Sequence, residues 1–72
     1  MYFRRIKDLR TDHDMSQAQI AEMLGCREGV YRRYEQGVRD IPIWALLRLA
    51  EFYDVSIDYL LGVSNNKRKY GE

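Results

Sequence analysis

The sequence predicts an all-α fold in which five short helices pack into one compact domain. Apolar residues recur at helical spacing in five segments, and no segment of five or more residues alternates with a period of two. Gly25, Gly37 and Gly62 and the single proline, Pro42, stand at the ends of the periodic segments and mark turns. At 72 residues the chain makes one domain with a small core.

The composition excludes several classes of protein. With 46% hydrophobic and 32% charged residues, the chain is typical of a folded domain rather than a disordered one. One cysteine cannot close an intrachain disulfide. No signal peptide is recognisable, and the longest apolar run, residues 43–47, is too short to span a membrane. We therefore expect a cytoplasmic protein without a membrane partner.

Charge is segregated along the chain, although the net charge is only +1. Residues 1–39 hold eight Lys and Arg against six Asp and Glu, and residues 40–66 hold one against four. Residues 67–72 hold three against one. A local basic face is therefore compatible with a nearly neutral protein.

The first two helices are predicted over residues 2–12 and 16–24. Ser16 and Gln19 have the spacing of a capping box, in which each side chain satisfies a backbone N–H of the other residue. Gly25 ends the second helix where a left-handed residue is wanted. The apolar stripes of these helices consist of Phe3, Ile6 and Leu9, and of Ile20, Ala21 and Leu24.

Three further helices are predicted over residues 27–36, 42–53 and 56–61. Ser56 caps the fifth helix, and the polar, basic residues 64–72 form a frayed tail behind a domain of residues 1–63. The fourth helix is apolar over a wide arc, so we expect it to be the most buried. Its expected inward residues are Ile43, Trp44, Leu46, Leu47, Leu49 and Ala50.

Residues 17–36 have the pattern of two helices that cross steeply over a very short turn. Ala21 is small where the second of these helices must pass close by. Gly25 accepts a backbone angle that a side chain resists, and Cys26 is expected to point inward as a small hydrophobe. Several positions thus agree for different physical reasons, which makes the pattern specific.

The helix over residues 27–36 has two faces of opposite character. Val30, Tyr31 and Tyr34 share one side, which we expect to be buried. No aliphatic side chain interrupts the other side, which consists of Glu28, Gly29, Arg32, Arg33 and Gln36, and Arg27 stands at the start of the helix. An α-helix fits the major groove of DNA, and Arg, Gln and Glu are residue types that read base edges there. A glycine lets the backbone approach DNA closely, at a cost of about 1 kcal/mol in helix propensity.

Residues 16–37 read SQAQIAEMLGCREGVYRRYEQG, and residues 41–62 read IPIWALLRLAEFYDVSIDYLLG. These stretches resemble the Cro/repressor-type helix-turn-helix domain of the Xre class of bacterial and phage transcriptional regulators. The resemblance covers residues 3–63. It implies a five-helix, lambda-repressor-like fold whose second and third helices form the helix-turn-helix. It also implies binding to double-stranded operator DNA, usually as a dimer on inverted repeats and in the role of a repressor.

The resemblance further implies roles for individual residues. Glu28 either accepts a hydrogen bond from a cytosine amino group or only favours the helix N-terminus. The family usually has Ser or Thr where Arg27 stands, and small polar residues are common where Gly29 stands. Implied base-facing residues are Arg27, Glu28, Gly29 and Arg32; implied groove-edge or phosphate contacts are Gln17, Arg33, Gln36 and Arg39. Arg10 and Glu35 match a pair that bridges the first and third helices.

A homodimer is also expected, and a protein-interaction role is the alternative to DNA binding. A second copy of the chain would dock on the last helix and its flank, at Ile57, Tyr59, Leu60 and Val63. The alternative is an antitoxin-like or other protein-interaction module that uses the same fold. No catalytic set, phosphate loop or metal-ligand spacing is present, and His13 stands alone. We therefore expect no enzymatic activity, cofactor, metal or small-molecule ligand.

Overall fold

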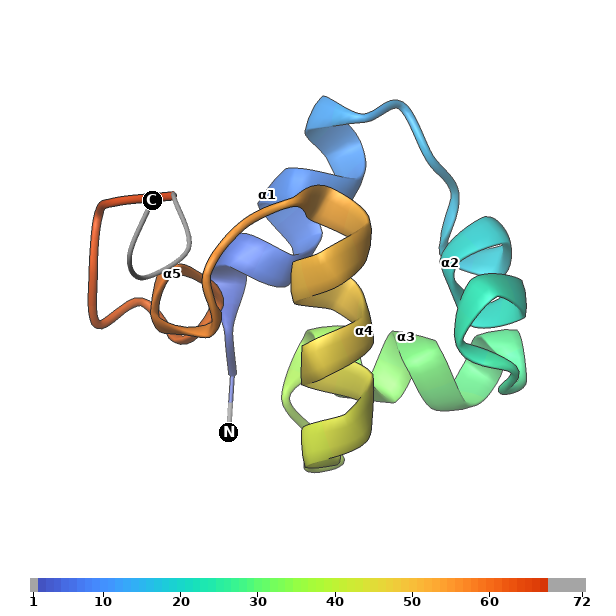
Figure 1. Cartoon of the computed structure of the whole chain (residues 1–72). Coiled ribbons are helices and arrows are strands. Elements are labelled where there is room, and N and C mark those ends of the chain that lie inside the picture. Colours follow the sequence, from blue (N-terminus) through green and yellow to red (C-terminus); the bar gives the residue numbers. More distant parts are fainter. Residues whose placement is uncertain (1, 68–72) are drawn as a thin grey trace.

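The computed structural model describes residues 2–67, which form five α-helices and no strand (Figure 1). The helices are α1 (Arg4–Asp12), α2 (Gln17–Leu24), α3 (Glu28–Gln36), α4 (Ile43–Tyr53) and α5 (Ile57–Leu61). The predicted all-α fold is confirmed, and the helices differ from the prediction only in where they begin. None of the described helices is long and apolar enough to cross a membrane.

The α2–α3 unit is formed by local signals that the sequence displays. The Ser16 Oγ accepts from the Gln19 N–H at 3.1 Å, and the Ser16 N–H donates to Gln19 Oε1 at 2.8 Å, so the capping box is complete. Gly25 ends α2 with a left-handed φ of 76°, and α3 begins three residues later. The two helices pack against each other at one end of the molecule (Figure 1).

A single core lies between the helices. Tyr31 is fully buried and Tyr34 nearly so, which confirms the inward side predicted for α3. Cys26 and Val30 are half-buried against this core. The other core side chains come from α1, α2, α4, α5 and two connecting segments: Ile6, Leu9, Ile20, Ala21, Leu24, Ile41, Ala45, Leu46, Leu49, Ala50, Tyr53, Val55 and Leu60.

Half of the residues predicted to face inward from α4 do so: Leu46, Leu49 and Ala50 are buried, as expected. Ile43, Trp44 and Leu47 are 71%, 49% and 55% exposed, so their expected burial is wrong. Its buried residues are Ala45, Leu46, Leu49, Ala50 and Tyr53. The helix is apolar on both sides, and the inward side is the one that includes the small residues Ala45 and Ala50. An apolar strip therefore remains exposed on α4.

The segment after α5 folds back onto the domain. The Arg5 guanidinium lies 4.1 Å from the Tyr59 ring centroid and donates to the backbone carbonyl oxygens of Tyr59 and Ser64. The Ser56 N–H donates to the carbonyl oxygen of Lys67 at 2.9 Å. The part of the predicted tail up to Lys67 is thus held in place rather than frayed, while residues 68–72 lie outside the described residues.

Candidate nucleic-acid interface

The α3 helix presents a polar face to solvent. Because Tyr31 and Tyr34 are anchored in the core, the side chains between and beside them turn outward. Arg32, Arg33 and Gln36 are exposed, and so is Glu28 in the first turn. The structure thus brings together on one face the helix residues that the sequence predicted to contact DNA.

Arg27 occupies the N-cap position of α3 in an extended conformation, with φ −77° and ψ 149°. Its side chain makes no capping hydrogen bond. A Ser, Thr, Asn or Asp here would stabilise the helix by about 1 kcal/mol relative to a residue that cannot cap. The exposed guanidinium instead stands free at the end of α3 that follows the turn.

Gly29 is not required by the backbone. It lies in the first turn of α3 and its φ is not in the left-handed region. A Cβ atom added here would meet only the Nη2 of Arg32, at an ordinary contact distance of 3.6 Å. The fold therefore leaves room for a methyl group, and its absence has no explanation within the chain itself.

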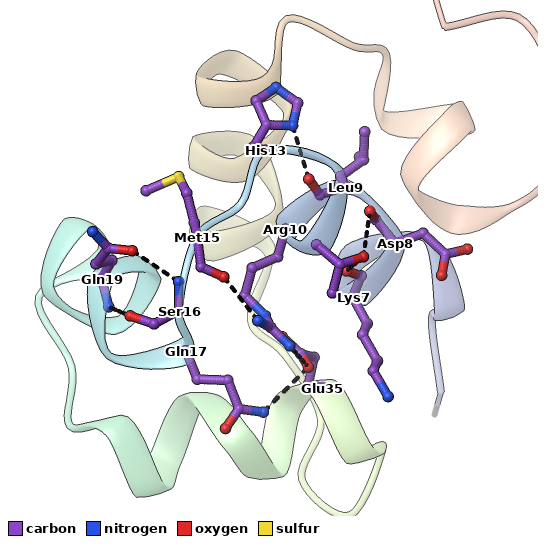
Figure 2. Close-up of polar contacts among 11 residues, drawn as sticks. Lys7, Asp8, Leu9, Arg10, His13, Met15, Ser16, Gln17, Gln19 and Glu35 are labelled. Atoms are coloured by element: carbon purple, nitrogen blue, oxygen red, sulfur yellow. Dashed lines mark hydrogen bonds and ion pairs between the residues drawn. The ribbon is translucent and has the colours of Figure 1, made fainter.

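A buried ion pair holds α1 against α3 (Figure 2). Arg10 Nε donates to Glu35 Oε2 at 2.7 Å, and Arg10 Nη2 donates to Glu35 Oε1 at 3.0 Å. The third guanidinium nitrogen, Nη1, donates to the Met15 carbonyl oxygen at 2.8 Å. The geometry is the bridge between the first and third helices that the resemblance implied, and it also fixes the segment that leads into α2.

Gln17 extends this network to the start of α2. Its Nε2 donates to Glu35 Oε1 at 3.2 Å, so the amide is held between α2 and α3 (Figure 2). Burial would raise the pKa of Glu35, but Arg10 above all, with the Tyr31 hydroxyl and the Gln17 amide, outweighs that effect and keeps the pKa below its ordinary value. Glu35 is thus an ionised anchor that orients a predicted phosphate contact.

The described basic residues fall into two groups. Five engage the protein itself: Arg4 pairs with Asp8, Arg10 pairs with Glu35, and Arg5, Arg48 and Lys67 lie over aromatic rings. The other five have no side-chain partner among residues 2–67; they are Lys7, Arg27, Arg32, Arg33 and Arg39. Four of these five are predicted DNA contacts.

Arg39, another of these unpaired cations, lies in the loop after α3. Its backbone N–H donates to the Arg33 carbonyl oxygen at 3.2 Å, which ties the loop to the end of the helix. Gly37 makes the reversal possible with a φ of 76°, and a Cβ there would come within 2.9 Å of the Tyr2 backbone. The Arg39 side chain is therefore exposed directly beyond the last turn of α3.

The residues predicted for a dimer interface lie in unequal environments. Leu60 is fully buried in the core, so it cannot contact a second copy, and its assignment was wrong. Tyr59 is half-buried and carries the Arg5 and Lys67 side chains on its ring. Ile57 is half-buried, and Val63 is 73% exposed. Leu60 was assigned from the spacing of an amphipathic helix. In the short helix α5, the apolar side that includes Leu60 packs against the core.

Sequence reasoning missed two features. The first is the exposed strip on α4, whose residues were assigned to the core. The second is Lys7, which lines one hollow of about 540 Å³ together with Arg10, Gln17, Glu28, Glu35 and Gln36. Lys7 precedes Arg10 by three residues and so shares its face of α1, a spacing that the sequence already displayed.

Other chemistry finds little support in the described part of the chain. No three His, Cys, Asp or Glu side chains within residues 2–67 gather closely enough to hold a metal ion. Burial raises the pKa of the Cys26 thiol, which keeps it in its less reactive neutral form. The ring of His13 lies 5.0 Å from that of Tyr53, and its Nδ1 is 2.8 Å from the Leu9 carbonyl oxygen.

Comparisons with known proteins point to one family. The family model described as helix-turn-helix matches residues 6–60. An uncharacterised HTH-type transcriptional regulator of Bacillus subtilis, YobD, is 38% identical over 92% of this chain and 59% of its own. The cryptic phage CTXphi transcriptional repressor RstR of Vibrio cholerae is 33% identical over 89% of this chain and 58% of its own.

A third relative, the HTH-type transcriptional regulator ImmR of Bacillus subtilis, is 35% identical over 92% of this chain and 52% of its own. The chain therefore spans between 52% and 59% of the length of these three relatives. No solved structure matches the chain significantly.

Proposed function

Because the chain belongs to the helix-turn-helix family of DNA-binding transcriptional regulators, we propose that it binds a specific double-stranded operator and represses transcription there. The observation that carries the proposal is the outward face of α3. Its arginines have no partner in the described chain, while the tyrosines opposite them are locked in the core. We propose that α3 lies in the major groove of this operator. We also propose that the protein acts in the cytoplasm.

The proposed contacts fall into two classes. Arg27 and Arg32 read bases, with Glu28 as a third candidate, and Gly29 lets the helix lie close to them. Since Arg favours the O6 and N7 atoms of guanine, we expect at least one G·C pair in the site. Gln17, Arg33, Gln36 and Arg39 hold the DNA backbone or the edge of the groove.

Repression and dimerisation are the finer parts of the proposal. One relative is named a repressor, which supports the same role here. A single domain of this size covers one half-site, and specific binding by this class of motif generally uses two half-sites about one helical turn apart. We propose a homodimer on an inverted repeat, with Ile57 and Val63 at its interface and Tyr59 at the margin.

The first experiment is in vitro selection of bound duplexes from a random pool. A single enriched motif is expected, with two inverted half-sites if the protein binds as a dimer. Arg32→Ala should then cost about 1–3 kcal/mol on the selected operator and relax the preference at one base pair. Arg4→Ala is the matched control, because Arg4 is exposed but pairs with Asp8. Unchanged affinity and base preference in Arg32→Ala would remove that residue from the reading face.

The dimer needs its own test. Val63→Glu places a charge on an exposed apolar residue and is expected to weaken self-association without affecting folding. Sedimentation of the wild-type protein, free and on the selected operator, measures the association directly. Monomers under both conditions would exclude the dimer while leaving DNA binding intact.

A protein-interaction module is the second candidate function. The exposed strip of Ile43, Trp44 and Leu47 on α4 favours it, because apolar residues that gather on a surface often mark a partner site. Salt separates the two functions, since phosphate contacts make DNA affinity fall steeply as salt rises. Binding to DNA that ignores sequence and depends little on salt would favour the interaction module.

A further inference from the structure

We infer that Lys7 on α1 is a phosphate-binding residue that holds the DNA backbone beside α3, a role that rests on the proposed function. Three observations carry it: the side chain has no partner in the described chain, it lies on the face of α1 that meets α3, and it lines the same hollow as two proposed DNA contacts.

The first observation is that the Lys7 ammonium is unengaged. Apart from α3, its N-cap residue Arg27 and the loop after it, Lys7 is the only described basic residue that makes no ion pair, hydrogen bond or ring contact through its side chain. Its neighbours on α1 are all committed to the protein: Arg4 to Asp8, Arg5 to the segment after α5, and Arg10 to Glu35. Lys7 thus offers a positive charge that the fold itself does not use.

The second observation is direction. Lys7 and Arg10 are three residues apart on a helix and therefore share a face. Arg10 uses that face to reach Glu35 on α3. Figure 2 shows the Lys7 and Gln17 side chains on opposite sides of the Arg10–Glu35 pair, both extending toward α3. Lys7 is therefore on the α3 side of α1 rather than on the side turned to α5.

The third observation is the hollow that these residues line. Its volume is about 540 Å³, and its walls come from α1, the start of α2 and both ends of α3. Gln17 and Gln36, two proposed DNA contacts, line it together with Lys7. A DNA strand that touches both glutamines therefore runs along the hollow that Lys7 also lines.

The charges around the hollow place the phosphate on its Lys7 side. Arg10 and Glu35 neutralise each other through two hydrogen bonds, so they add little net field. Glu28 brings a carboxylate from the first turn of α3, which repels a phosphate from that end. Lys7 is the unpaired cation of the hollow, and a lysine binds phosphate as a compact point charge without the fixed planar geometry of arginine.

The experiment measures operator affinity against salt, with the selected operator and a random-sequence duplex as probes. Lys7→Gln is expected to weaken binding to both duplexes by a similar factor and to make the slope of log K against log salt shallower by about 0.9. Lys7→Arg should restore the wild-type slope. Arg4→Gln removes one charge from the same helix and should leave the slope unchanged, because Asp8 already compensates Arg4.

The outcomes separate this inference from the proposed function. If Lys7→Gln keeps the wild-type slope while Arg32→Ala loses its base preference, the protein binds DNA but Lys7 does not hold a phosphate. If the wild-type protein shows neither sequence preference nor a steep salt dependence, the proposed function falls, and this inference falls with it. A thermal melt of Lys7→Gln is expected to match the wild type, since the side chain has no described partner to lose.

Discussion

Replacing Gly29 by alanine separates what the fold requires from what the ligand requires. In the structure the glycine has ordinary helical geometry, and a methyl group would touch only the flexible end of Arg32, at 3.6 Å. Glycine costs a helix interior about 0.5–1 kcal/mol relative to alanine. Because Gly29 is in the first turn, we expect Gly29→Ala to stabilise the protein by about 0.5 kcal/mol, the lower end of that range.

The same substitution is expected to weaken operator binding. If the backbone of α3 lies against the DNA at Gly29, an added methyl group has no room in the complex although it has room in the free protein. Inserting a methyl group into a tightly packed contact costs about 1–3 kcal/mol. The variant should therefore be more stable and bind less tightly, a combination that a general folding defect does not produce.

Thermal unfolding and operator titration are the two assays. A gain of about 0.5 kcal/mol corresponds to a rise in melting temperature of about 2–4 °C for a domain of this size. Gly62→Ala is the matched control: its φ of +81° strains any side chain, so it should destabilise the fold without changing the affinity of the folded protein. Loss of stability in Gly29→Ala would refute the steric argument, and unchanged affinity would refute the close approach of DNA.

Three further predictions concern α3 and its anchor. Arg27→Ser supplies the missing cap and should stabilise the fold by about 1 kcal/mol in urea unfolding while lowering operator affinity; a stable variant that binds as well as the wild type would show that Arg27 contacts no DNA. Arg10→Met leaves Glu35 charged and buried, and should destabilise by about 3–5 kcal/mol, most of it regained in the Arg10→Met/Glu35→Leu double variant. Since the pKa of Glu35 is lowered on folding, the ionised carboxylate stabilises the fold above its ordinary pKa of 4.5, and this stabilisation is lost as the pH falls through the folded pKa. Acid unfolding of the wild type and of Glu35→Gln measures this loss. Equal losses of stability in the two proteins would contradict the prediction.

Helix ends were predictable from the sequence because their signals are local. Ser16 and Gln19 stand at the spacing of a capping box, and Gly25, Gly37 and Gly62 supply the left-handed residues that end helices. Each of these features depends only on residues within one turn. Packing elsewhere in the chain does not have to be known to place them.

The inward side of α4 was not predictable in the same way. Apolar residues occupy both sides of this helix, so the period identifies a helix but does not fix which side is buried. The two charged residues were the better guide. Arg48 and Glu51 lie on the arc that includes Leu47, and their charges need water, so that arc faces outward. Leu60 is the opposite case, because we predicted it at a surface of the very short helix α5 and it is fully buried in the core.

The sequence does not show which Lys and Arg side chains are already paired with a carboxylate, and binding to DNA depends strongly on that pairing. An arginine already paired with a carboxylate must give up that pair to bind a phosphate or a base, whereas an unpaired arginine exchanges only water and counterions. Exposed ion pairs stabilise a fold by about 1 kcal/mol at most, so leaving Arg27, Arg32, Arg33 and Arg39 unpaired costs this protein little. The fold thus commits its buried carboxylate to Arg10, which positions α3, and leaves the cations of α3 and its flanking loop unpaired. The DNA contacts proposed for these cations would therefore not require breaking any contact that holds the domain together.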